Sequence, residues 1–314
     1  MNNNVKITLF GGLGEELLDL IGFGVLCKYL NYKSNVSFYI DQKFDCLDNK
    51  LDIRLFNFNQ ITISDDECNF YVNSPNPSYS LCPYRVYEFI EKFLNELTFE
   101  QFSNDFVEYS KIIIKPSEII LSKIPNDIEK AYGIHLRKKD KNGNTHDIID
   151  DYSRYEFEIT TNKLLEDVKN IIISEEETIF LIVCEDNNWK KEIYDIIIDF
   201  SIKNNKLIKI LDIDYDNENN YYDYNNVLDM FCLSKCKEIL QGVQYSAFSI
   251  LASLLGNNKI RNYSNYTNNY VDCFVNCWSS VIEINNNKNY DTELHKKTLR
   301  RVMIMATNIN EIFI

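Results

Sequence analysis

The sequence lacks any apolar run long enough to cross a membrane. Its most apolar stretches, such as residues 171–173 and 251–255, are far shorter than the roughly 20 residues of a spanning helix. The opening MNNNVKITLF has neither the basic segment nor the small-residue cleavage site of an export signal. These absences predict a cytoplasmic protein without a membrane-spanning segment.

Positive charge is scarce. The 33 Lys and Arg residues are outnumbered by 47 Asp and Glu residues, which gives a formal net charge of -14. An acidic surface releases no counterions from a phosphate backbone, so nucleic acid is excluded as the main partner. A phosphorylated small molecule would still bind wherever cations are concentrated locally.

The chain also lacks the cysteine pattern of a disulfide framework. Its 9 cysteines are an odd number scattered over 314 residues, which predicts reduced thiols. Two pairs have a four-residue spacing, Cys232 with Cys236 and Cys273 with Cys277. Zinc sites usually show the shorter Cys-x-x-Cys spacing, so small apolar side chains in a core are favoured over a zinc site, and no metal is expected.

What the sequence does contain is a regular alternation of strand and helix patterns. In the second half, strands are expected at residues 131–137, 178–184, 207–211 and 238–240. Helices are expected at residues 155–173, 187–204, 225–236 and 246–255, the last of them closed by Gly256. This alternation predicts an α/β fold with parallel sheets covered on both faces.

The first half opens with an expected strand at residues 5–10, a Gly-Gly-Leu-Gly turn at 11–14 and a helix at 15–30. Further strands are expected at 36–40 and within 51–63, and helices at 84–97 and 117–124. A chain of this length exceeds the usual size of a single core. We expect an N-terminal domain at residues 1–126, a second domain at 127–291, and a C-terminal helix and tail at 292–314.

Ligands of open α/β sheets bind outside the carboxyl ends of the strands, and three segments fall there. The first is the glycine turn at 11–14, where glycines allow a ligand to approach the backbone closely. It lacks the third glycine of the dinucleotide fingerprint and the Gly-Lys-Ser/Thr of a P-loop. An ordinary tight turn explains it equally well.

The second segment follows the expected strand at 131–137. It places the cations of Arg137, Lys138, Lys139 and Lys141 within five positions of an otherwise acidic chain. An arginine at the carboxyl end of a strand suits a diphosphate, because its planar guanidinium makes two permanently charged hydrogen bonds. The alternative is a solvated basic turn, with His135 as a core histidine.

The third segment begins the helix expected at 246–255. Ser246 and Ser249 either cap this helix or donate to a phosphate held at its positive end. Phe248 fits the apolar core. A fourth segment, Asp-Ile-Asp at residues 212–214, is similar to a metal–nucleotide motif, but it begins an Asn- and Asp-rich stretch and is favoured as a solvated acidic loop.

Taken together, three motifs in this order resemble the superfamily of α-1,2-, α-1,6- and protein O-fucosyltransferases. They are Gly-Gly-Leu-Gly at 11–14, His-x-Arg at 135–137 and Ser-x-Phe-Ser at 246–249. Asp140 extends the second motif, in which Lys138 replaces a second arginine. The first motif continues with two glutamates where the α-1,2 enzymes have Asn-Gln.

The resemblance implies a GT-B fold, in which two Rossmann-like domains with parallel sheets face a central cleft. It also implies an inverting, metal-independent glycosyltransferase that moves fucose from GDP-fucose to a glycan hydroxyl, without a further cofactor. Transfer of another nucleotide sugar and a catalytically silent GT-B binding module are the alternatives.

By position in the motifs, the resemblance also implies residue roles. Arg137 would hold the β-phosphate and stabilise the charge of the departing GDP. The nucleotide sugar would further contact the residues Gly12, Gly14, His135, Asp140, Ser246, Phe248 and Ser249. A base is needed for the acceptor hydroxyl. The α-1,6 enzymes have a Glu after their arginine box, where this chain has Gly-Asn-Thr-His-Asp, so Asp147 becomes the candidate, with His146, Asp19 and Glu15 as alternatives.

Overall fold

The structure is a computed structural model that describes residues 4–8, 13–14, 17–18, 20–22, 33–37, 55–58, 62–63, 99–136, 151–215, 224–242 and 246–263. The chain divides into two compact units. Unit 1 comprises residues 1–122, 216–227 and 270–314, and unit 2 comprises residues 123–215 and 228–269. The domain limits expected from the sequence stay a prediction. Among the described residues, no helix combines the length and the apolar character needed to cross a membrane.

Unit 1 contains a parallel sheet in the order β1-β2-β4, made of β1 (Asn4–Thr8), β2 (Lys33–Ser37) and β4 (Thr62–Ile63). The expected start of β2 at residue 36 was wrong. The strand begins at Lys33, because the whole polar stretch Lys33 to Asn35 pairs with β1 (Asn4↔Lys33, Lys6↔Asn35). Polar side chains carry no strand periodicity, so only pairing with β1 reveals this start.

The first helix of unit 1 begins earlier than expected. Leu13 and Gly14 are already helical, whereas the sequence placed the start of the helix at Glu15. Leu13 is buried, as are Leu17, Leu18, Leu20 and Ile21 on the following turns. Burial of Leu13 on the same apolar face explains the earlier start, since periodicity alone leaves helix ends uncertain by a residue or two.

Unit 1 also contains an antiparallel pair formed by β3 (Phe56–Phe58) and β5 (Ile114–Pro116). Helix α3 (Phe99–Ile113), which the sequence interpretation missed, leads directly into β5, and the short helix α4 (Glu118–Leu121) follows it. On α3, Val107, Ser110 and Ile113 are buried, and the Ser110 hydroxyl donates to the Val107 carbonyl 2.8 Å away.

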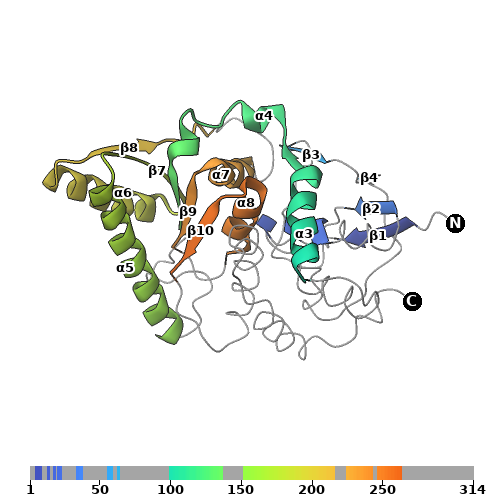
Figure 1. Cartoon of the computed structure of the whole chain (residues 1–314), viewed down its shortest axis with the longest axis horizontal. Coiled ribbons are helices and arrows are strands. Elements are labelled where there is room, and N and C mark those ends of the chain that lie inside the picture. Colours follow the sequence, from blue (N-terminus) through green and yellow to red (C-terminus); the bar gives the residue numbers. More distant parts are fainter. Residues whose placement is uncertain are drawn as a thin grey trace. The chain divides into compact units, whose positions relative to one another are not determined.

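Unit 2 is built on a five-stranded parallel sheet in the order β10-β9-β6-β7-β8 (Figure 1). Its strands are β6 (Tyr132–Leu136), β7 (Glu177–Cys184), β8 (Leu207–Leu211), β9 (Glu238–Gln241) and β10 (Lys259–Asn262). Four of them lie where the sequence predicted strands, and β10 was missed. The chain moves outward from β6 in one direction and then returns to β9 on the other side, which is the Rossmann order.

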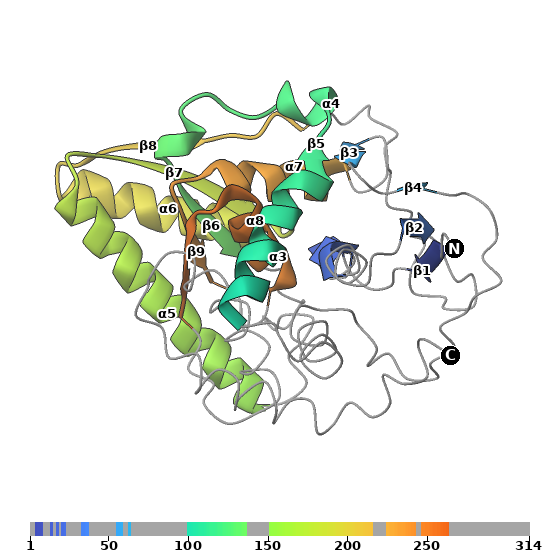
Figure 2. The ribbon, with the colours of Figure 1, turned by 45° about the vertical axis from the view of Figure 1, so that its right-hand side comes forward.

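Helices cover both faces of this sheet (Figure 2). Helices α5 (Asp151–Ser174) and α6 (Asn187–Lys203) pack on one face, where Ile134, Phe180 and Ile182 meet Leu164 and Ile193 in one core. Each fully buried aliphatic side chain contributes about 1.5–3 kcal/mol to folding. Helices α7 (Tyr224–Lys235) and α8 (Ala247–Gly256) lie on the other face.

Helices α7 and α8 meet at a tight joint. The sequence placed Gly256 after the helix, but Gly256 is its last residue and Asn257 takes the left-handed conformation, with φ 53°. The reason is a close approach, because a Cβ atom on Gly256 would overlap the carbonyl oxygen of Ser234. Asparagine tolerates the left-handed conformation better than most residues, so it ends the helix here.

Asn258 closes the joint from the other side. Its Nδ2 donates to the carbonyls of Leu233, Ser234 and Cys236, at 3.0, 3.4 and 2.8 Å. These carbonyls lie at the carboxyl end of α7, where the helix supplies few donors, and the Leu233 carbonyl also accepts from the Cys236 backbone N–H at 3.1 Å. Asn258 is 8 % exposed, so water does not replace it.

We expect Asn258→Ala to lower the free energy of unfolding by about 1–3 kcal/mol, since it leaves buried carbonyls unpaired. Equilibrium urea unfolding measures this loss. The matched control is Asn204→Ala, because Nδ2 of the exposed Asn204 donates 2.8 Å to the Phe200 carbonyl at the end of α6. Water can take over that bond, so we expect a loss below about 0.5 kcal/mol. Equal losses for the two variants would contradict the capping role of Asn258.

Candidate functional site

The strand order of unit 2 locates a candidate site. The order reverses between β6 and β9, and open α/β sheets bind ligands outside the carboxyl ends of the strands at such a switch point. Here the two carboxyl ends are held in register, since His135 pairs with Gln241. The next backbone N–H, that of Gly242, donates to the His135 carbonyl 3.0 Å away.

Two of the sequence motifs meet at this switch point. Strand alternation turns Leu136 into the core under α5 and α6 and turns His135 toward α8 on the opposite face. The rings of His135 and Phe248 lie with centroids 5.1 Å apart. His135 is 6 % exposed, so this contact is part of a packed interior. The fold thereby joins residues more than one hundred positions apart in the chain.

The start of α8 is organised by the serines of the third motif. Ser246 is the N-cap, and its hydroxyl oxygen accepts from the backbone N–H of Ser249 at 3.4 Å. The Ser249 hydroxyl in turn donates to the Ser246 carbonyl at 3.4 Å. The capping expected from the sequence is therefore present. Because Ser246 accepts in this bond, its own O–H proton is available to an anion at the positive end of the helix.

The other site residues predicted from the sequence lie either in unit 1 or outside the described residues. Gly14 is a buried helical residue of unit 1. Gly12, Arg137, Asp140 and Asp147 lie outside the described residues, as do two of the cysteines considered for zinc, Cys273 and Cys277. The structure thus brings together the residues His135, Ser246, Phe248 and Ser249, and the ligand roles of all these residues stay predictions.

Sequence reasoning missed two residues that end β9 at the switch point. Gln241 is fully buried there, although amides are rarely buried without a role. A Cβ atom on Gly242 would lie 2.5 Å from Leu164 Cδ2 and 2.9 Å from Leu136 Cδ2, so the chain turns close to the core. The signal was present, since a glycine two residues after the strand expected at 238–240 marks a close approach of the backbone.

A second polar pair lies at the same edge of the sheet. The Tyr215 hydroxyl donates to Oδ1 of Asp229 at 2.6 Å, and Asp229 is only 9 % exposed. Tyr215 follows the carboxyl end of β8, and Asp229 lies in the second turn of α7. Strand β7, between β8 and β6, ends beside the site, because Cys184 pairs with Leu136.

Asp229 has the properties of a functional carboxylate. Burial raises its pKa to about 7, against which the Tyr215 hydrogen bond and the Lys190 ammonium act in the opposite direction. Carboxylates with a strongly shifted pKa at the carboxyl edge of a sheet are candidates for ligand recognition. The sequence signal was a single acidic residue in an apolar helical stretch, between Leu228 and Met230.

The acidic and cysteine side chains considered as metal ligands have surroundings that do not favour a metal. Asp212 and Asp214 are exposed, and Asp214 forms an ion pair with Lys123 at 2.9 Å. Cys232 and Cys236 lie on α7, where burial raises the pKa of both thiols well above its usual value and disfavours the thiolate that binds zinc. Among the described residues, no three His, Cys, Asp or Glu side chains are grouped as a metal would require.

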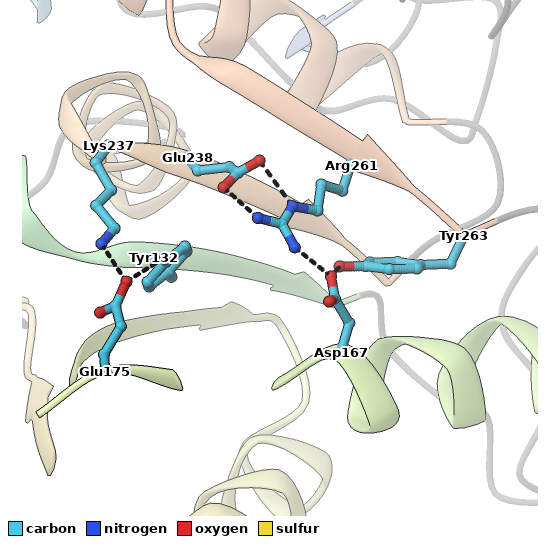
Figure 3. A network of polar contacts seen from close by, with 7 residues as sticks. All are labelled: Tyr132, Asp167, Glu175, Lys237, Glu238, Arg261 and Tyr263. Atoms are coloured by element: carbon cyan, nitrogen blue, oxygen red, sulfur yellow. Dashed lines mark hydrogen bonds and ion pairs between the residues drawn. The ribbon is translucent and has the colours of Figure 1, made fainter. Parts of the chain in front are cut away.

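Other charged groups of unit 2 serve the opposite, amino edge of the sheet (Figure 3). The Tyr132 hydroxyl and the Lys237 ammonium both donate to Oε1 of Glu175, at 2.6 and 2.9 Å. The Lys237 Nζ also lies 3.9 Å from the centroid of the Tyr132 ring. These residues precede or begin β6, β7 and β9, so they fix strand starts and are not candidates for the site.

The second group in Figure 3 ties α5 to the β9–β10 edge. Arg261 makes a two-point contact with Glu238, from Nε at 2.7 Å and from Nη2 at 2.8 Å, and its Nη1 donates to Asp167 at 2.8 Å. The Tyr263 hydroxyl donates to the same Asp167 carboxylate at 2.5 Å. All four residues have partners within this group, which gives it a structural role.

Comparison with known proteins gives a likeness of fold. No protein-family model matches the chain, and no curated protein matches it by sequence. Among solved structures, a FUT1 variant of Arabidopsis thaliana in complex with GDP superposes with a TM-score of 0.53 at 11% identity, over 85% of this chain and 72% of FUT1. The likeness to FUT1 confirms the α/β fold with a parallel sheet that the sequence predicted, and the central cleft stays a prediction.

Two further proteins match with lower TM-scores. The α-1,6-fucosyltransferase NodZ soaked with GDP-fucose gives a TM-score of 0.49 at 11% identity, over 81% of this chain and 93% of NodZ. A structure of NodZ from Bradyrhizobium gives 0.48 at 12% identity, over 81% and 92% of the two chains. POFUT1 in complex with GDP-fucose gives 0.47 at 9% identity, over 82% and 97%.

Proposed function

We propose that this chain, which has the fold of the fucosyltransferase superfamily, is an inverting, metal-independent fucosyltransferase that uses GDP-fucose as donor and a glycan hydroxyl as acceptor. The observation that carries the proposal is the contact of His135 with Phe248, which joins two superfamily motifs at the switch point of a Rossmann-like sheet. FUT1, with the same fold, was solved with GDP.

In this proposal the diphosphate binds between Arg137 and the start of α8. Arg137 directly follows β6 in the sequence, and the Ser246 hydroxyl and the first N–H groups of α8 lie at the carboxyl edge of the same sheet. The permanent charge of Arg137 and the partial positive charge of the helix end both favour an anion. His135, Asp140, Phe248 and Ser249 complete the nucleotide side.

Asp229 supplies recognition of the base. A carboxylate accepts two hydrogen bonds side by side, and guanine offers two adjacent donors, N1–H and the N2 amino group. Uracil offers a single N–H between two acceptors, so a carboxylate discriminates against it. Asp229 is buried at the carboxyl edge of the same sheet and therefore favours a guanine nucleotide over a uridine nucleotide.

The transfer itself needs a base and a stabilised leaving group. The acceptor oxygen forms a bond to the anomeric carbon of fucose while the bond from that carbon to the β-phosphate oxygen breaks. The acceptor proton passes to the Asp147 carboxylate, and the negative charge that develops on GDP is stabilised by Arg137. We also assign Gly12 and Gly14 to binding of the sugar and the acceptor, as their place in the first motif implies. We place the reaction in the cytoplasm.

The test is the thermal stability of the full chain with GDP, GDP-fucose, UDP and UDP-glucose. A ligand at about 100 times its Kd stabilises the folded state by about 2.7 kcal/mol, which raises the melting temperature measurably. We expect shifts with GDP and GDP-fucose and much smaller shifts with UDP and UDP-glucose. A shift with the uridine nucleotides alone would replace fucose by another sugar. Absence of any shift would contradict a transferase and favour a silent GT-B module.

A further inference from the structure

The contact between Tyr215 and Asp229 is short and directional. The Tyr215 hydroxyl lies 2.6 Å from Oδ1 of Asp229, a length typical of a hydrogen bond to a charged oxygen. Burial, and then the neighbouring Asp229 carboxylate, raises the pKa of Tyr215 above its usual value. Tyr215 therefore stays protonated at every physiological pH and acts only as a donor.

This contact engages one side of the carboxylate. Among the described residues, the Tyr215 hydroxyl is the hydrogen-bond donor that reaches Asp229, and it contacts Oδ1. The carboxylate has about four acceptor positions, so Oδ2 and the second lone pair of Oδ1 still need donors. A nearly buried carboxylate with acceptor positions to spare is suited to a ligand that brings N–H groups.

Charged and titratable groups surround the pair on every neighbouring element. Lys190 on α6 lies with its Nζ 5.7 Å from the centroid of the Tyr215 ring and favours the ionised form of Asp229. Glu185, after β7, opposes ionisation. The Cys232 thiol on α7 and the Cys184 thiol at the end of β7 are neutral, because burial raises the pKa of both.

We propose that Tyr215 is a positioning residue that orients the Asp229 carboxylate and keeps it ionised near neutral pH, so that Asp229 can accept hydrogen bonds from the guanine of the donor. The proposal rests on the function proposed above. Tyr215 lies four residues beyond the end of β8, so its phenol reaches Asp229 across the carboxyl edge of the sheet.

The direction of the pH effect follows from the chemistry of Asp229. Burial holds its pKa at about 7, well above that of an ordinary aspartate, so donor affinity is full at higher pH and is lost as the pH falls through about 7. The Tyr215 hydrogen bond lowers this pKa. Without the hydroxyl, the pKa rises further, and the loss of affinity begins at a higher pH.

The experiment measures Kd for GDP-fucose by calorimetry from pH 6 to 8.5, for the full chain and for Tyr215→Phe. The diphosphate of GDP-fucose is doubly esterified and keeps a constant charge in this range. A rise of about one unit in the pKa of Asp229 weakens binding about fivefold at pH 7 and less than twofold at pH 8.5. Asp229→Asn, which cannot titrate, should bind weakly with a flat pH profile.

Tyr194→Phe is the matched control, because Tyr194 is 42% exposed on α6 and the hydroxyl that donates to Asp229 is that of Tyr215. It should leave the profile unchanged. A pH-independent loss of affinity in Tyr215→Phe would indicate a merely structural role and overturn the proposal, as would a profile identical to that of the unchanged chain. If the unchanged chain does not bind GDP-fucose, the proposed function fails as well, and that result is recognised without any variant.

Discussion

Arg137→Ala should lower the rate of GDP release from GDP-fucose by about 100-fold or more, the usual cost of removing a group that stabilises charge on a leaving group. Arg137 follows β6 directly, at the switch point where His135 and Phe248 meet. The rate is measured with saturating donor, by detection of free GDP with water or an added glycan as acceptor. Because the charge of GDP develops during the reaction, kcat should fall more than donor affinity.

Two further variants sharpen this prediction. Arg137→Lys keeps the charge and loses the two-point geometry, so it should recover only part of the rate. Lys203→Ala removes one positive charge from an exposed position at the end of α6 and should leave the rate unchanged. If Arg137→Ala stays within about threefold of the unchanged chain, Arg137 does not stabilise the leaving group.

Gly256→Ala should be the most destabilising single-methyl change in unit 2. The added Cβ overlaps the carbonyl oxygen of Ser234, a backbone atom at the end of α7 that cannot rotate away. Helices α7 and α8 must separate or α8 must lose its last turn, and we expect a loss of about 3 kcal/mol or more in the free energy of unfolding. Equilibrium urea unfolding is the measurement.

Gly133→Ala provides the comparison for this variant. Its added Cβ would lie 2.7 Å from Leu233 Cδ2 and 3.0 Å from Cys236 Sγ. A leucine methyl group moves by rotation about its side-chain bonds, so the loss should be about 1–2 kcal/mol. If Gly256→Ala lowers the free energy of unfolding no more than Gly133→Ala does, helices α7 and α8 can shift apart at little cost.

The sequence was most informative where local signals and tertiary structure agree. Strand β8 lies at the residues expected, because an apolar alternating run follows the short turn at the end of α6. The Rossmann-like class followed from the alternation of elements in unit 2, and the three short motifs indicated the superfamily. Ser246 was recognisable as a helix cap because hydroxyl residues at that position have a local function.

The features that the sequence did not predict depend on contacts between residues that are distant in the chain. Strand β10 carries Lys259 and Arg261 at the edge of the sheet, and only its pairing with β9 identifies it as a strand. The sequence marks Asp229 only as an acidic residue in an apolar stretch, and its raised pKa comes from burial under neighbours that the fold assembles. Periodicity cannot anticipate that Tyr215, beyond another strand, would supply the donor.

The joint between α7 and α8 holds these two helices together as one rigid pair. Asn258 binds the carboxyl end of α7 and Gly256 packs the carboxyl end of α8 against it, while Asp229 in the second turn of α7 and Ser246 at the N-cap of α8 both lie toward the carboxyl edge of the sheet. In the function we propose, the span from the Asp229 carboxylate to the start of α8 is therefore fixed before any ligand binds. A fixed distance between the base site and the phosphate site favours nucleotides long enough to reach both. GMP should therefore bind far more weakly than GDP, even though both present the same base.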